Sequence, residues 1–422
     1  MKRKFAILLS AMLLTQAVCG CDGAASSGTS SASASTGSIE SKSSEKAVIV
    51  TDEQDFTHEN GITRLAKEIY GDLNEFFVLS EDTQERETQI SSLRVEIMAG
   101  GGPDGYLLSS PTSNMTFNGE GHPATLFPDV QRTMQSGAFL PLDDYIKESE
   151  YLRSEDHFAP VFDTGKTDEG QVVLPITYYA SVFLLDKAQL ADPDFTPKTW
   201  DELVNCEDTA VLKVVRNNLY TWCGAGIPRI ADYATEKTIL TEENLTAQFE
   251  NLLAMPASES FDEETALIQS GSYAQTDEGM AYYAQNKDTV NALAIPNTEG
   301  GVTAFITSYA AINRNSPKAD EVFRFFELLF SDEAQIDTET VNDARGTLLM
   351  LGNLNSFLTH KNAYLQPELL ESVQSRVNAV RFYSVMDYTI YDTATTLTWE
   401  ENPDCAAAAH SVIEALQTRL SE

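Results

Sequence analysis

The sequence predicts an α/β protein large enough for two lobes, and three observations support this prediction. Short apolar runs typical of strands alternate with stretches whose apolar residues recur at helical spacing. The chain after residue 46 is long enough to build two hydrophobic cores. Its middle, Gln171–Leu203, begins as a strand rich in Val, Ile, Phe and Tyr and closes on a helix start, where Thr199 and Glu202 form a capping box.

Residues 1–20 are predicted to be an export signal. Three basic residues precede an apolar run, Phe5–Val18, that is too short to span a membrane. The run ends in Val18-Cys19-Gly20-Cys21, which resembles the lipobox of bacterial lipoproteins. The resemblance implies that Cys21 becomes the acylated first residue of the mature protein, held at the membrane by lipid. An ordinary cleaved signal with two incidental cysteines is the alternative.

A low-complexity segment begins at Cys21, the predicted lipid-anchored residue. Residues 21–46 are rich in Ser, Ala, Gly and Thr, a composition that cannot bury a core. We expect a flexible tether that lifts the folded part away from the membrane. After this segment no stretch is long and apolar enough to predict a transmembrane helix.

The chain is strongly acidic, with 28 Lys and Arg against 64 Asp and Glu and a formal net charge of −36. This balance disfavours nucleic acid as a partner, because nucleic-acid binding needs basic patches. A cationic ligand such as a polyamine stays open, although an acidic surface that keeps the protein soluble is the simpler interpretation.

The first half of the folded part is predicted to alternate strands and helices. A helix over Glu85–Ala99 should stop at Gly100–Pro103, because glycine adopts the left-handed cap and proline cannot continue a helix. The other elements expected here are a strand at Ala47–Val50, a helix with the apolar residues Ile62, Leu65, Ile69 and Leu73, and strands at Glu75–Leu79 and Tyr106–Leu108.

The second half continues this alternation. A helix should begin after Ser316 and Pro317, because serine caps a helix and proline fits its first position. The other features expected are Val322, Phe326 and Leu329 on the buried face of that helix, a capping box at Ser260 and Glu263, a strand from about Val290 to Pro296, a strand at Thr307–Ile312, and a last helix capped by Asn402 with Ile413, Leu416 and Leu420 buried.

Several segments of the chain match one known family in sequence and in order. They are Glu96–Asp104, Met134–Leu142, Gly170–Pro175, Leu185–Lys187, Pro197–Leu203, Gly279–Ala281 and Ala311–Gln335. Together they resemble the large extracellular solute-binding proteins of ABC importers, the maltose-binding-protein-like group. The resemblance implies a two-lobe periplasmic-binding-protein (Venus-flytrap) fold with three interlobe crossings. Lobe 1 would comprise residues 47–170 plus about 308–345, and lobe 2 residues 171–307 plus about 346–422, with the third crossing at Arg345-Gly346-Thr347.

Motifs for enzyme chemistry are missing from the sequence. None of the five histidines lies in H-E-x-x-H or another metal spacing, and no G-x-S-x-G occurs. Paired carboxylates such as Asp143-Asp144 carry little weight in so acidic a chain. We therefore expect no enzyme activity, cofactor or metal, with a secreted hydrolase as the alternative.

The solute site is expected in the cleft between the lobes. A sugar needs aromatic rings against its C–H faces and Asp, Asn, Arg or backbone groups for its hydroxyls. The candidate ligand-binding residues, taken from segments that the resemblance places near the cleft, are Asp104, Tyr178, Tyr179, Trp222, Tyr309, Tyr388, Tyr391 and Asp392.

Some candidates have an equally good structural role. Asp104 could brace its own turn, and Trp222 could belong to the core. Strand alternation requires at least one of Tyr178 and Tyr179 to face the core. Trp200 is assigned to packing, because its place in a capping box explains it.

The resemblance predicts a monomeric, lipid-anchored extracellular receptor that delivers a solute to the permease of an ABC transporter. A carbohydrate is the default solute by analogy with the family. A surface protein that binds a partner without transport is a further alternative. Cys206 and Cys223 could form a disulfide or remain free thiols.

Overall fold

The computed structural model describes residues 45–110, 124–218, 224–256, 273–336, 343–352 and 356–421. The chain divides into two units, Met1–Glu40 and Ser41–Glu422, and all described residues belong to the second. The predicted signal, Cys21 and the capping box at Ser260 and Glu263 lie outside these ranges. Within them, no helix is long and apolar enough to cross a bilayer.

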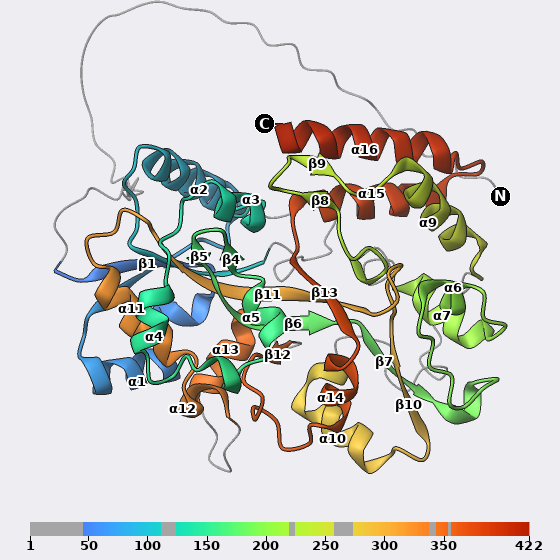
Figure 1. Cartoon of the computed structure of the whole chain (residues 1–422), viewed down its shortest axis with the longest axis horizontal. Coiled ribbons are helices and arrows are strands. Elements are labelled where there is room, and N and C mark those ends of the chain that lie inside the picture. Colours follow the sequence, from blue (N-terminus) through green and yellow to red (C-terminus); the bar gives the residue numbers. More distant parts are fainter. Residues whose placement is uncertain are drawn as a thin grey trace, which may run out of the picture. The chain divides into compact units, whose positions relative to one another are not determined.

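A mixed seven-stranded sheet is the largest sheet among the described residues (Figure 1). Its order is β12-β6-β11-β3-β1-β2, with β13 paired to β11. Strand β1 is parallel to β2 and β3, whereas β11 runs antiparallel to β3 and β6 and parallel to β13. The strands are β1 Ala47–Thr51, β2 Asn74–Val78, β3 Gly105–Ser109, β6 Leu174–Ala180, β11 Val302–Ile312, β12 Phe357–Leu358 and β13 Val377–Phe382.

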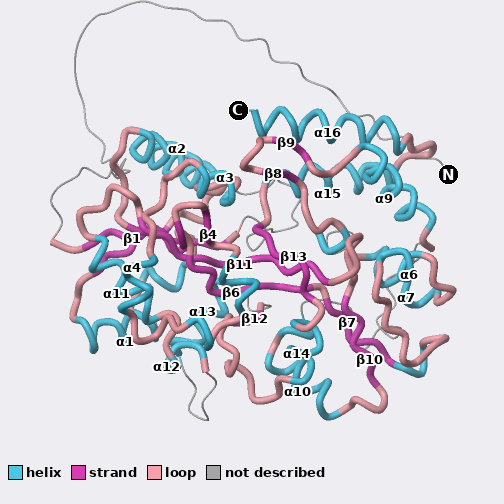
Figure 2. Tube along the Cα trace, viewed as in Figure 1, coloured by secondary structure: helices cyan, strands magenta, loops and turns pink. Residues whose placement is uncertain are grey.

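Helices accompany this sheet, as the predicted alternation requires (Figure 2). They are α1 Gly61–Tyr70, α2 Thr83–Met98, α3 Val130–Gln135, α4 Asp143–Glu148, α5 Ala159–Asp163, α11 Ala319–Leu328, α12 Asp332–Gln335 and α13 Asp343–Leu351, with a hairpin of β4 Lys166–Thr167 and β5 Gly170–Gln171. Helix α1 begins with a capping box between Asn60 and Thr63 and ends at Gly71, whose φ of 84° suits glycine.

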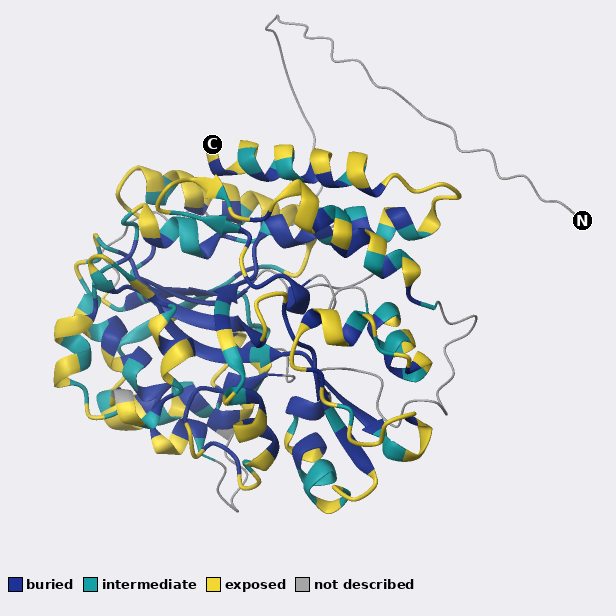
Figure 3. Ribbon diagram, turned by 45° about the vertical axis from the view of Figure 1, so that its right-hand side comes forward, coloured by how far each residue is buried: buried dark blue, intermediate teal, exposed yellow. Residues whose placement is uncertain are grey.

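A second core lies beyond this sheet. Strand β7 pairs with β10, and helices α9, α15 and α16 join one cluster of buried apolar residues. Helix α16 turns its buried residues inward and its exposed residues outward (Figure 3). The elements are β7 Val182–Asp186, α6 Trp200–Val204, α7 Thr209–Asn217, β8 Ala231–Asp232, β9 Lys237–Thr238, α9 Glu242–Ala254, α10 Asp277–Gln285, β10 Val290–Ala294, α14 Glu368–Gln374, α15 Val385–Trp399 and α16 Cys405–Ser421.

The first passage between the two cores falls at Ser181. Strand β6 belongs to the large sheet, and the chain continues as β7, which pairs with β10 (Figure 1). Gln275 holds the backbone beside this point, because its Oε1 accepts from the Ala180 N–H at 3.1 Å and its Nε2 donates to the Ala180 carbonyl at 2.8 Å. The Ile295 N–H donates to the Ser181 carbonyl at 2.9 Å. Hydrogen bonds to Ala180 and to Ser181 therefore hold the backbone in place at the crossing.

Most predicted elements are confirmed, within a few residues at their ends. The buried stripe of α11 is confirmed, and Trp200 is 2% exposed, as its packing role predicted. The predicted stripe of α1 is wrong in part, because Ile69 is 47% exposed and Leu73 follows the helix. The segment Arg345-Gly346-Thr347, the predicted third crossing, lies within α13. The other two passages between the cores run from β10 into β11 and from β13 into α15, so β6, β11 and β13 are the crossing strands.

Two capping predictions need correction. Thr199 caps α6, accepting from the Glu202 N–H at 3.2 Å, but the Glu202 carboxylate accepts from the Lys198 N–H rather than from Thr199. The last helix, α16, is capped by Asp404, which accepts from the Ala407 N–H at 3.0 Å, and not by Asn402. Asp404 immediately precedes Cys405, the first helical residue, so its carboxylate reaches the free N–H groups of the first turn.

Candidate functional site

The crossing strands β6, β11 and β13 bring three side chains into one row. Tyr179 on β6 pairs with Phe305 on β11, which pairs with Arg381 on β13. Directly paired residues project from the same face of a sheet, so these three share one face. We call it the site face.

The opposite face of the same strands is apolar. Tyr178 pairs there with Ile306 and with Phe357 of β12. Its ring is fully buried, and its hydroxyl accepts from Gln374 of α14 at 2.7 Å. We call this the α14 face. Tyr178 therefore belongs to the core, which confirms that one of the two adjacent tyrosines faces inward.

Arg381 is the centre of the site face. Its guanidinium lies over the ring of Phe305 at 4.7 Å and over that of Tyr383 at 5.7 Å. The two rings stack with their centroids 4.2 Å apart. Asp387 binds the guanidinium with both oxygens, at 2.9 and 2.7 Å. Both charges are buried, so the pair supplies polar groups without a net charge.

Local structure explains the position of Asp387. It is the third residue of α15, and it forms a capping box with Ser384, whose N–H donates to Asp387 at 2.9 Å. The Val385 N–H donates to the Pro128 carbonyl at 3.0 Å. The start of α15 is thereby tied to the segment that leads into α3.

A second carboxyl group approaches from α3. Asp129 caps this helix, accepting from the Arg132 N–H at 3.1 Å, and it receives a hydrogen bond from the Tyr233 hydroxyl. Burial raises the pKa of Asp129 to about 6, and the nearby charge of Asp387 adds to the effect. Because Asp129 caps α3 and Tyr233 follows β8, this bond joins elements of the two cores.

A cavity of about 280 Å³ adjoins these groups. Its walls are Gln131, Pro228, Arg229, Ile230, Ala231, Tyr233, Asn378, Ala379, Val380 and Arg381. They come from α3, from the β8 region and from the crossing strand β13. A small solute in this cavity would touch both cores at once.

Close packing beside the cavity depends on Gly224. A Cβ atom at this position would lie 2.4 Å from the Tyr383 hydroxyl and 3.4 Å from the Phe305 ring. Any larger residue would push into the stacked rings. The glycine therefore lets the backbone of the second core approach the site face.

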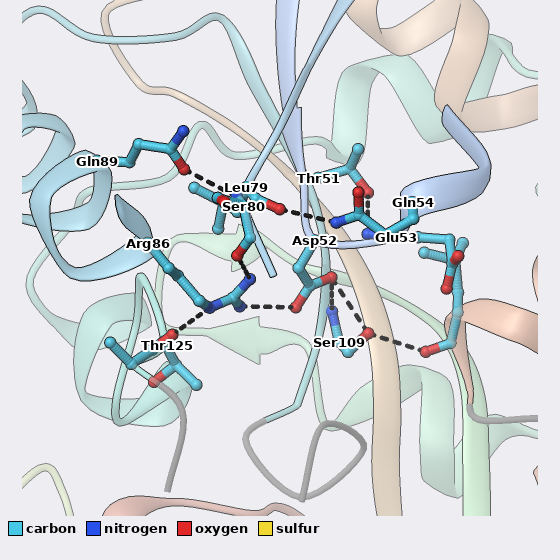
Figure 4. Close-up of polar contacts among 12 residues, drawn as sticks. Thr51, Asp52, Glu53, Gln54, Leu79, Ser80, Arg86, Gln89, Ser109 and Thr125 are labelled. Atoms are coloured by element: carbon cyan, nitrogen blue, oxygen red, sulfur yellow. Dashed lines mark hydrogen bonds and ion pairs between the residues drawn. The ribbon is translucent and has the colours of Figure 1, made fainter. Parts of the chain in front are cut away.

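The carboxyl ends of β1 and β3 form a polar edge, where ligands commonly bind in open α/β sheets (Figure 4). Asp52 accepts from the Ser109 N–H at 3.1 Å and from its hydroxyl at 3.2 Å, and Arg86 of α2 lies 3.7 Å away. Burial raises the pKa of Asp52, against the effects of Arg86 and Ser109. These contacts fasten the ends of β1 and β3 to each other and to α2.

Two predicted site residues have structural partners. Asp104 accepts from the Val48 N–H at 2.9 Å and from the Ser316 hydroxyl at 2.7 Å, the bracing role left open from the sequence. Tyr309 is 1% exposed and packs edge-on against Phe382 at 5.6 Å.

The remaining predicted residues divide between α15 and the undescribed part of the chain. Tyr388, Tyr391 and Asp392 lie on α15, with Tyr388 buried and Asp392 exposed. Burial raises the pKa of the Tyr388 hydroxyl. Trp222 lies outside the described residues, as does Cys223. Cys206 is a free thiol.

The candidate site contains residues that the sequence did not single out. They are Asp129, Tyr233, Phe305, Arg381, Tyr383 and Asp387. One signal was present in the sequence: Arg381 is a charge inside the apolar run Val377–Phe382. A buried arginine requires a partner, and the acidic residue six positions on supplies it.

The chain belongs to the family of bacterial extracellular solute-binding proteins, whose model matches residues 88–336. Among curated proteins no sequence matches it. The family is one of binding proteins, and the predicted two-lobe α/β fold of periplasmic binding proteins is confirmed by solved structures.

Three solved structures illustrate the likeness in fold. The sugar-binding protein MalE from the phytopathogen Xanthomonas citri is 11% identical, with a TM-score of 0.56 over 89% of this chain and 97% of that one. A family 1 solute-binding protein from Alicyclobacillus acidocaldarius is 11% identical, with a TM-score of 0.54 over 89% and 98%. A periplasmic oligogalacturonide-binding protein from Yersinia enterocolitica is 13% identical, with a TM-score of 0.51 over 89% and 99%.

Proposed function

We propose that this protein is a lipid-anchored extracellular receptor that captures a sugar or oligosaccharide and delivers it to the permease of an ABC transporter. The observation that carries the proposal is the row Tyr179, Phe305 and Arg381 on the crossing strands, extended by Tyr383 and Asp387. Aromatic rings pack against the C–H faces of sugars, and an Arg–Asp pair offers donors and acceptors to hydroxyls. No covalent chemistry is required.

The charges of the site favour a neutral solute over a polyamine. A cation needs carboxylates that are free to pair with it, but Asp387 is already bound by Arg381. Asp129 is bound by Tyr233, and its raised pKa makes it a poorer anion near pH 6. A sugar can use both groups as hydrogen-bond partners without needing their net charge.

Lobe closure supplies the signal for transport in this proposal. A solute held between α3 and the β8 region contacts both lobes and so stabilises the closed state over the open one. The strands β6, β11 and β13 are the three crossings about which the lobes would move. The permease then distinguishes the closed receptor from the open one.

The membrane anchor rests on the sequence of the N-terminal region. Residues 1–20 are the proposed signal, Cys21 the proposed lipid attachment, and residues 21–46 the tether. We further propose that the receptor acts as a monomer, because one chain carries both walls of the site.

A screen of melting temperature tests the proposal. Sugars, oligosaccharides, polyamines and short peptides are added to the purified protein, and a solute at 100 times its Kd should stabilise it by about 2.7 kcal/mol. We expect a rise with one class of sugar, together with compaction in solution scattering and no chemical change in the sugar. A rise with polyamines alone would overturn the sugar assignment, and turnover of the sugar would overturn the receptor assignment.

A further inference from the structure

A larger cavity lies in the second core, against helix α9. It has a volume of about 370 Å³ and is walled by α6, by the segment before β8, by α9 and by the loop between β10 and β11. Trp200, Ile227 and Leu240 supply apolar surface. We call it the α9 cavity.

Three amide side chains of α9 line the same cavity. Asn244, Gln248 and Asn251 lie at intervals of four and three residues, which places them along one side of the helix. Gln248 is 5% exposed, and its Oε1 is buried without a hydrogen bond from any described residue. Buried amide oxygens in folded proteins accept a hydrogen bond as a rule, so we expect the Gln248 Oε1 to have a hydrogen-bond donor as well.

Three charged residues line the cavity. One of them, Asp201, is exposed on α6, and the other two form a pair. Arg229 and Glu299 pair with each other at 3.4 Å, and both are about half exposed at the rim. Apolar surface facing a row of amides suits a molecule with an apolar ring face and with hydroxyl or amide groups along its edge.

We propose that the α9 cavity is a second binding site, for a small uncharged molecule of this kind, such as a single pyranose ring with hydroxyl and acylamino groups. Its hydroxyl or amide N–H groups would offer Gln248 the donor that its oxygen lacks. The site is separate from the proposed solute site on the crossing strands, and its occupancy does not depend on the function proposed for that site.

The wall of the α9 cavity is connected to the crossings. Thr298 and Glu299 line it, and they adjoin Asn297, which is fully buried. The Asn297 side chain donates to Thr303 of β11 at 3.1 Å and to Asn378 of β13 at 2.7 Å. A molecule bound against this loop would therefore bias the geometry of two crossing strands.

The two cavities also share a wall. Pro228 and Arg229 line both the α9 cavity and the 280 Å³ cavity beside Arg381. If binding in the α9 cavity displaced Pro228 and Arg229, the wall of the 280 Å³ cavity would move as well. Occupancy of the α9 cavity should accordingly change the affinity for the transported solute, as an effector does.

Methyl NMR of the purified protein tests the binding step directly. N-acetylglucosamine serves as the probe, and the methyl signals of Ile227 and Leu240 report on the α9 cavity. Ala247 lines the cavity but is exposed on α9, so Ala247→Phe should fill it without disturbing the core. Ala254→Phe, on an exposed residue at the end of the same helix and outside the cavity wall, is the matched control.

We expect saturable shifts of both methyl signals in the native protein and in Ala254→Phe, and binding at least tenfold weaker in Ala247→Phe. Equal binding by all three proteins, or shifts confined to residues outside the cavity, would overturn the proposal. So would the absence of shifts with this probe, or shifts of these methyl groups with spermidine or citrate in its place. Each result is read at Ile227 and Leu240, so failure of the transport function would not alter it.

Discussion

The two faces of the crossing strands carry different chemistry although they share one backbone. The site face holds Arg381 against two stacked rings, with Asp387 completing a buried ion pair. The α14 face holds Tyr178 among aromatic rings, with Phe357 at 5.5 Å and Phe158 at 5.7 Å between centroids. One face contains groups suited to a polar solute, and the other contains packing.

This difference predicts that adjacent residues contribute differently to stability and to solute binding. The α14 face gains stability from burial, since apolar side chains there are removed from water. The site face keeps polar groups buried at a cost, which is offset only while each group has its partner. Substitutions on the α14 face should thus act on stability alone, whereas those on the site face should also act on solute binding.

Removal of Arg381 should give the largest effect. Arg381→Met leaves the Asp387 carboxylate buried without its partner, and breaking a buried pair costs about 3–5 kcal/mol. Urea unfolding of the native and variant proteins measures the loss. The double variant Arg381→Met, Asp387→Leu should regain most of it, because it leaves no unpaired charge.

An exposed ion pair provides the control. Lys166 pairs with Asp163, and their side chains are 50% and 56% exposed. Lys166→Met should cost less than about 1 kcal/mol, because water already solvates both charges. Comparable losses in Lys166→Met and Arg381→Met would remove the argument that burial makes the Arg381 pair important.

The titration of buried groups should also distinguish the two faces, with opposite signs. His157 lies beside Phe158, which packs on the α14 face, and burial lowers the pKa of His157 from 6.5 to about 4. Tyr151, His360, Asp156 and Lys361 modify this pKa to a smaller extent. Because the folded protein disfavours protonated His157, the stability that this residue contributes is full above pH 6.5 and is lost as the pH falls to about 4.

Asp129, which caps α3 beside the site face, should act in the reverse direction. Its pKa is raised from 3.8 to about 6, so the folded protein favours the protonated form, and the contribution to stability grows as the pH falls from about 6 toward 3.8. Each contribution is on the order of 3 kcal/mol. Urea midpoints between pH 7 and pH 4 should lose less in His157→Gln, and more in Asp129→Asn, than in the native protein. Parallel pH curves for all three would contradict both assignments.

Sequence patterns in short windows predicted those elements whose formation depends on residues close together in the chain. The strand at Ala47–Val50, the helix over Glu85–Ala99 and the stripe of Val322, Phe326 and Leu329 follow from alternation, periodicity and caps in a short window, and all are present. Helix α15 was not predicted. Its run is rich in threonine and is buried on more than one side, so it lacks the amphipathic pattern of a surface helix.

The site could be predicted only in part, because its residues meet through strand register. Tyr179 was selected from its segment, but its neighbours Phe305 and Arg381 come from strands more than 100 residues away in the chain. Nothing near Tyr179 specifies which residues of β11 and β13 will lie beside it. Register is set by the packing of whole faces and by the crossings, which are properties of the folded chain.

The smallest change separates two neighbouring tyrosines. Tyr178→Phe removes only the hydroxyl that accepts from Gln374, at a cost of about 1 kcal/mol, and should leave solute affinity unchanged. Tyr179 is half-buried, and its hydroxyl accepts from Ser181 at 3.2 Å at the first crossing. Tyr179→Phe should change stability little but weaken solute binding by roughly tenfold, through loss of one hydrogen bond to the solute.

Tyr178→Phe and Tyr179→Phe compare the two faces directly, because they remove the same hydroxyl group from adjacent residues on opposite faces. Urea unfolding gives the stability of each, and calorimetric titration with the sugar found in the melting screen gives its affinity. If Tyr178→Phe weakened binding as much as Tyr179→Phe, the solute would depend on the packing of both faces together. That result would mean that the site face supports binding without contacting the solute. Direct contact with the solute predicts instead that only the hydroxyl on the site face affects the affinity, because adjacent strand residues point to opposite faces.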